Sequence, residues 1–114
     1  MKREQLLKVL LVLVGLLFSA LLYPCILFFR QEPALSMMLS VYATLGVFLL
    51  LASRNPSAHR SLIAFTAWSS FAHAAVMGLQ AHLHLIAHGE LIGVAALILI
   101  GLALLLLAPP KLST

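Results

Sequence analysis

The sequence contains very little charge. Of its 114 residues, 3 are acidic and 7 are Lys or Arg, so charged residues make up 9% of the chain. A water-soluble domain carries roughly a quarter charged residues, so this chain lacks the side chains needed to cover a soluble surface. Its cations are scattered and form no basic face, which argues against nucleic acid as a partner.

Cysteine is almost absent, since Cys25 is the only one. A single cysteine excludes an intrachain disulfide and leaves no second thiolate for a metal or redox centre, so we interpret Cys25 as a small buried apolar residue. The sequence also lacks a P-loop, a dinucleotide fingerprint, a nucleophile elbow, a zincin motif and a CxxC pair. We therefore expect a protein that is not an enzyme. The lack of acidic residues within the apolar stretches argues against proton-coupled transport.

Four long apolar stretches, separated by short polar joints, occupy nearly the whole chain. A helix of about 20 apolar residues spans the hydrocarbon core of a bilayer. We therefore predict transmembrane helices at residues 6–29, 34–52, 62–81 and 90–108. Because the joints are short, neighbouring helices are expected to run antiparallel. The predicted fold is an all-α, integral membrane four-helix bundle with up-down-up-down topology, forming a single transmembrane domain over residues 1–114.

Proline and glycine mark the joints and one irregularity. Pro33 suits the first turn of the second helix. Pro24 lies inside the first span, where it frees the carbonyl near Ala20 and is expected to kink that helix. The third joint has one strong breaker, Gly89. The first apolar run continues to Phe29, which is too long for a signal-peptide core, so we expect it to remain as a membrane anchor.

The distribution of cations predicts the orientation. Six of the seven fall on one side of the predicted bundle and only Arg30 on the other; the six are Lys2, Arg3, Lys8, Arg54, Arg60 and Lys111. The side rich in Lys and Arg is normally cytoplasmic. We therefore expect a multi-pass protein with cytoplasmic N- and C-termini, and with His82, His84 and His88 at the outer surface.

The third span carries a polar face inside the membrane. This face comprises Ser70, His73, Met77 and Gln80, and the second span offers Ser40 and Thr44 as partners. An ionisable residue at mid-span, such as His73, is costly and often functional. Two interpretations remain open: a hydrogen-bonded seam between packed helices, or a narrow wet path in which His73 binds a ligand or transfers protons.

The histidines of the third joint form a second candidate site. His84 and His88 are four residues apart, which places both imidazoles on one helical face if the helix continues that far, as bidentate metal binding requires. Histidines at a membrane surface are also commonly just hydrated. A b-type haem between His73 and an outer histidine is a further alternative. We expect no cofactor, with haem b or a transition metal at His73, His84 and His88 as the alternative.

The fourth span has a face of small residues. Gly89, Gly93 and Ala96 lie along one side of the predicted helix, and Gly89 and Gly93 form a GxxxG motif. Such motifs let helix backbones approach closely in membranes. We expect this face to pack against another helix, from the same chain or from a different one.

One segment resembles a known family. It runs from Arg54 to Ile63 (RNPSAHRSLI) and continues through Phe65, Trp68, Ser69, Ser70, His73, Val76 and Met77 to Gln80. This pattern is similar to a motif in small uncharacterised bacterial inner-membrane proteins, a family defined by a domain of unknown function. The resemblance implies a location in the bacterial cytoplasmic membrane and implies no activity.

Three functions are compatible with these features. We expect a non-enzymatic helical-bundle subunit that contacts the lipid bilayer and associates with itself or with other membrane subunits. The first alternative is a small channel or carrier that uses the polar face of the third span. The second is a redox subunit that binds haem or a metal.

Overall fold

The computed structural model describes residues 2–109, and over that range the chain is helical with no strand. Four helical stretches are long and apolar enough to cross a membrane: Lys2–Leu27, Pro33–Ala52, Pro56–His82 and His88–Leu107. The prediction of an all-α protein with four membrane-length helices is therefore confirmed. Lys111, one of the cations used to predict the orientation, lies outside the described residues.

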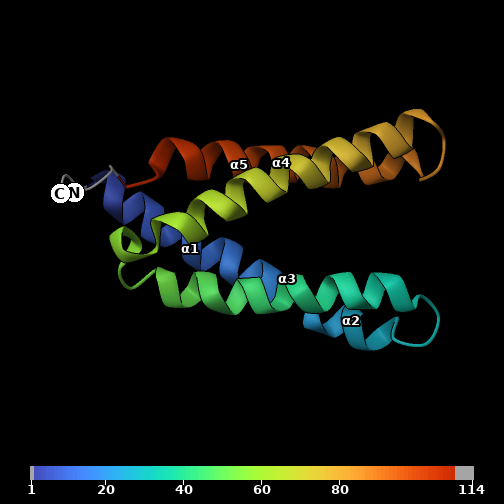
Figure 1. The fold of residues 1–114 in the computed structure, drawn as a ribbon, viewed down its shortest axis with the longest axis horizontal. Helices are drawn as coiled ribbons and strands as arrows, with labels where there is room; N and C mark the ends of the chain where they lie inside the picture. Colours follow the sequence, from blue (N-terminus) through green and yellow to red (C-terminus); the bar gives the residue numbers. More distant parts are fainter. Residues whose placement is uncertain (1, 110–114) are drawn as a thin grey trace. The chain divides into compact units, whose positions relative to one another are not determined.

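The helices form two compact units that divide between His59 and Arg60. The first contains α1 (Lys2–Ser19), α2 (Leu22–Leu27), α3 (Pro33–Ala52) and the 3₁₀ turn η1 (Pro56–His59). The second contains α4 (Arg60–His82), the 3₁₀ turn η2 (His88–Glu90) and α5 (Leu91–Leu107). Within each unit the long helices lie side by side and run antiparallel (Figure 1).

The first predicted span is broken into two helices by a turn at Ala20 and Leu21. Pro24 has no N–H to donate to the carbonyl of Ala20, which instead accepts a bond from the backbone N–H of Tyr23 at 3.1 Å. Regular helical bonding resumes with Cys25, whose N–H donates to Leu21 O at 3.0 Å. The kink expected from Pro24 is therefore present, and it sets α2 off as a separate half-helix beside α3 (Figure 1).

The start of α3 follows from the Glu32–Pro33 pair. A residue before proline is pushed out of the helical region, and Glu32 accordingly has φ −137°. Pro33 then occupies the first turn of α3, as the sequence predicts. The Glu32 carbonyl accepts a 3.0 Å bond from Ser36 N, so the new helix is bonded from its first turn.

α1 and α3 cross at two glycines. A Cβ placed on Gly46 would lie 2.7 Å from the carbonyl oxygen of Gly15 and 2.8 Å from Phe18 Cβ, and it would also strike the backbone nitrogen of Ser19. Ordinary van der Waals contacts of a Cβ begin at 3.4 Å. The two backbones are therefore in direct contact, which only residues without side chains allow.

Apolar residues on either side of this crossing complete the α1–α3 contact. Four positions of α1 at helical spacing are buried, namely Leu7, Leu11, Val14 and Phe18. The ring of Phe18 meets that of Tyr42 edge-on, with centroids 5.2 Å apart. This geometry is the favoured one for aromatic pairs.

The second unit is a hairpin of α4 and α5. Its close contact lies at Gly101, where an added Cβ would come within 2.6 Å of a ring atom of Phe71. At the open end of the hairpin, Arg60 Nε donates a 3.1 Å hydrogen bond to the carbonyl of Pro109. A cation at this position also suits the C-terminal dipole of α5. The bond ties the first residue of α4 to the chain just beyond α5.

The closed end of this hairpin begins with a residue in the left-handed conformation. α4 ends at His82, and His84 has φ +61°. Leu85 N donates to Gln80 O at 2.8 Å, and His84 N donates to Ala81 O at 3.1 Å. These two bonds define a Schellman motif with His84 at the position that glycine normally occupies. Gly89, which the sequence suggested as the breaker, has no positive φ and lies within η2.

Candidate functional site

Three hydroxyls of α4, including that of Ser70 on the predicted polar face, are bonded to their own helix. Thr66 and Ser70 are almost completely buried, at 0% and 1% exposure. The Thr66 hydroxyl donates to Leu62 O at 2.9 Å, and the Ser70 hydroxyl donates to Thr66 O at 2.7 Å. The Ser69 hydroxyl donates to the same Thr66 carbonyl at 3.2 Å. These hydroxyls therefore donate their hydrogen bonds to backbone carbonyls of α4, as serine and threonine in membrane helices often do.

The remaining residues predicted on the polar face lie along the C-terminal half of α4. His73, Met77 and Gln80 are all partly buried. The methyl of Met77 lies 3.6 Å from where a Cβ on Gly93 would stand, so Met77 is directed toward α5. Trp68 lies away from the buried positions, 61% exposed, with its ring edge-on to Phe71 at 5.4 Å. These contacts are those of a packed helix pair.

Ser40 and Thr44, proposed as partners for the polar face of α4, are exposed residues of α3. The Ser40 hydroxyl donates to Met37 O at 2.6 Å, and the Thr44 hydroxyl donates to Ser40 O at 3.0 Å. Both are therefore bonded within their own helix. This local bonding makes a partner helix unnecessary for either hydroxyl.

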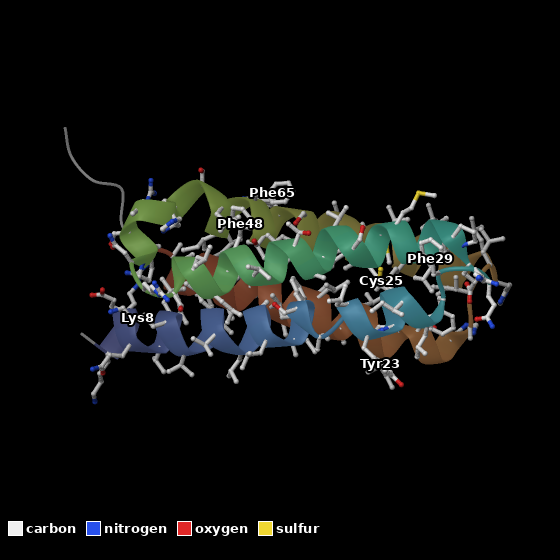
Figure 2. The ribbon with its side chains drawn as sticks, turned by 90° about the horizontal axis from the view of Figure 1, so that it is seen from below. Lys8, Tyr23, Cys25, Phe29, Phe48 and Phe65 are labelled. Atoms are coloured by element: carbon white, nitrogen blue, oxygen red, sulfur yellow. The ribbon has the colours of Figure 1, made fainter. Side chains whose placement is uncertain are left out.

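A polar contact that the sequence analysis missed joins α2 to α3. The Ser36 hydroxyl donates to the carbonyl of Cys25 at 2.8 Å, and the Cys25 thiol donates to the carbonyl of Ser36 at 3.3 Å. Their Sγ and Oγ atoms are 3.4 Å apart. Figure 2 shows Cys25 on the side of α2 that faces α3 and Tyr23 pointing away from it. Cys25 is thus a partly buried hydrogen-bonding group, whereas we expected a small buried apolar residue.

The signal for this contact was present in the sequence but weak. Cys25 and Ser36 lie eleven residues apart on either side of a short joint. When a short joint connects two antiparallel helices, residues near the end of the first helix lie close to residues near the start of the second. The pairing could be found only by knowing that Pro24 sets off α2 and that α3 begins at Pro33.

The histidines of the third joint are placed differently from the prediction. The prediction that His84 and His88 share a helical face is wrong, because α4 ends at His82 and His84 adopts a positive φ. The turn nevertheless brings their rings together, with centroids 5.7 Å apart and planes tilted by 48°. Both side chains are exposed. Within residues 2–109, no group of three or more His, Cys, Asp or Glu side chains is arranged to hold a metal ion.

The small residues of the fourth span are only partly engaged within the chain. Gly89 lies in η2 with open space where a Cβ would stand, and Gly93 faces Met77. Ala96 is exposed. The glycines at which helices actually touch are Gly101, on α5, and the Gly15–Gly46 pair in the first unit. The GxxxG spacing did not point to these positions because the contacts depend on which helix lies opposite.

These features describe an α-helical, multi-pass membrane protein in which the buried hydroxyls of Ser36, Thr66 and Ser70 are bonded within helices and hairpins. The chain belongs to a family of unknown function, DUF6632, whose family model matches residues 2–110. The resemblance to an uncharacterised family noted in the sequence is thereby confirmed. No curated protein and no solved structure matches the chain.

Proposed function

We propose that this protein is a non-enzymatic subunit that acts by associating laterally with other helices in the membrane, either copies of itself or other subunits. The observation that carries the proposal is the small buried fraction of α5. Of its residues only Gly101 and Leu104 are buried, although the helix carries a face of small residues suited to close packing. In membranes, faces of small residues are enriched where helices pack closely against one another.

The bonding of the polar groups supports this proposal over a channel or carrier. A water path needs hydroxyls that can exchange hydrogen bonds with passing water or substrate. Thr66 and Ser70 instead donate to carbonyls of α4 itself, and both are buried. Their arrangement therefore favours helix packing over a polar conduit.

Association can be tested with a matched pair of substitutions on α5. Ala96 and Ile98 are both exposed. They point in directions about 200° apart around the helix, because each residue turns the chain by about 100°. We expect Ala96→Phe to reduce the complex recovered in mild detergent and the crosslinking seen in intact membranes, because it fills the small-residue face. Ile98→Phe should leave both unchanged. A protein that is monomeric, without crosslinked or copurifying partners in membranes, would contradict the proposal.

We further propose that the protein lies in the bacterial cytoplasmic membrane with both termini in the cytoplasm. In the first unit, Lys2, Arg3 and Lys8 belong to the start of α1, and Arg54 follows α3 at the same end of the hairpin. In the second unit, Arg60 begins α4 and is bonded to the chain beyond α5. Arg30, in the joint between α2 and α3, is at the opposite end of its hairpin. This distribution supports a cytoplasmic location for the cationic ends.

Reporter fusions test the orientation directly. A reporter that is active only in the cytoplasm should work when fused after Thr114 and fail when inserted in the joint 30–33. A reporter active only outside the cytoplasm should give the reverse pattern. Equal activity at both positions would rule out the proposed topology.

A further inference from the structure

The turn between α4 and η2 holds a histidine in the left-handed conformation, which is uncommon for residues other than glycine. His84 lies at φ +61°, fixed by the two hydrogen bonds of the Schellman motif. Glycine occupies this position without cost, whereas a residue with a Cβ loses roughly 1–2 kcal/mol there. A strained residue at an exposed turn is a reason to ask what its side chain does.

The strained backbone places the imidazole of His84 beside that of His88. Their ring centroids are 5.7 Å apart. A metal–nitrogen bond of about 2.0–2.1 Å puts a ring centroid about 3.2 Å from the ion, so two imidazoles on one ion have centroids at most about 6.4 Å apart. The observed separation lies inside that limit. The two rings are therefore close enough for one nitrogen of each to bind a shared ion.

We propose that His84 and His88 form a two-histidine chelating site for a divalent transition metal. Imidazole nitrogens favour Cu²⁺, Ni²⁺ and Zn²⁺, and among these Cu²⁺ binds such ligands most tightly. Water completes the coordination, since the described residues gather no third protein ligand here. Both histidines are exposed, so the ion reaches them from the aqueous phase.

The two ligands sit on separate hydrogen-bonded turns, which gives the site a defined geometry. His84 is held by the end of α4. His88 begins η2, where the N–H of Glu90 donates to Ala87 O at 3.0 Å. A bound ion would therefore join the end of α4 to the start of α5 and restrain the hairpin turn.

The substitutions that test the site keep the backbone intact. His84→Asn removes the imidazole but keeps a residue type that tolerates the left-handed conformation. His88→Gln removes the second ligand. His82→Gln is the matched control, because His82 is an exposed histidine two residues away that ends α4 and is outside the ring pair.

The experiment is a Cu²⁺ titration of the full chain in detergent, purified through a tag without histidine, and followed by calorimetry and electron paramagnetic resonance. We expect one Cu²⁺ per chain with two imidazole nitrogens in its spectrum. Affinity should fall by about tenfold or more in His84→Asn and in His88→Gln and stay unchanged in His82→Gln. Circular dichroism of each variant confirms that it remains helical. An equal loss in the His82→Gln control, or wild-type affinity in both ligand variants, would overturn the proposal.

Discussion

The substitution Gly46→Ala tests the contact between α1 and α3 most severely. The added Cβ would stand 2.7 Å from Gly15 O and 2.8 Å from Phe18 Cβ, against 3.4 Å for ordinary contact. The obstructing atoms include backbone, which no side-chain rotation can clear. The helices would have to separate locally by about 0.7 Å to clear Gly15 O and by more to clear the backbone nitrogen of Ser19. Overpacking of this kind costs about 1–3 kcal/mol.

Gly78→Ala provides the matched control. Gly78 is also in a membrane-length helix, but nothing lies within 4 Å of its added Cβ. Alanine is favoured over glycine in helices by about 1 kcal/mol, so this variant should be as stable as the parent or slightly more stable. Alanine at position 46 has the same advantage in helix propensity, but there the steric cost of the added Cβ is larger.

The assay is thermal unfolding in detergent, monitored by circular dichroism and by the reaction of a maleimide dye with Cys25, the only thiol. We expect Gly46→Ala to melt several degrees below the parent and to expose Cys25 earlier. Gly78→Ala should melt at or above the parent temperature. If Gly46→Ala melted no lower than Gly78→Ala, the backbone contact at the crossing would be refuted.

Three further predictions follow from other contacts. Ser36→Ala removes the hydroxyl bonded to Cys25, so it should lower the free energy of unfolding by about 1 kcal/mol and speed alkylation of Cys25. Ser40→Ala should change neither the stability nor the alkylation rate. Equal alkylation rates in the two variants would contradict the α2–α3 contact. His84→Gly should raise the melting temperature, since glycine relieves about 1 kcal/mol of left-handed strain, and a lower melting temperature would count against the Schellman assignment. His73→Gln should retain the helical fold and cost about 1–2 kcal/mol, and an unchanged melting temperature would contradict a structural role for His73.

The sequence predicts the helices well because the bilayer imposes a simple length requirement. Apolar runs of membrane length, closed by short polar joints, leave few other folds. Pro24 and Pro33 also have local effects that can be stated in advance, since a missing N–H and a fixed φ act within one turn. For these reasons the break after α1 and the start of α3 both match the prediction.

The errors arose where the outcome depends on a three-dimensional neighbour or on a competing turn. Gly89 looked like the breaker, yet α4 ends earlier because the Schellman bonds form around His84. The spacing of Gly89 and Gly93 drew attention to one end of α5, whereas the close contact occurs at Gly101 because Phe71 lies opposite. A helical wheel gives the direction of a residue but not what it meets.

The self-bonded hydroxyls of α4 bear on how this helix enters the membrane during biosynthesis. α4 belongs to the least hydropathic of the four candidate spans. The acceptors of Thr66 and Ser70 are carbonyls of the preceding turn, which exist as soon as the helix forms. The helix can therefore partition into lipid with these hydroxyl groups already hydrogen-bonded. The Cys25–Ser36 contact differs, because it needs two helices and can form only after both have been inserted.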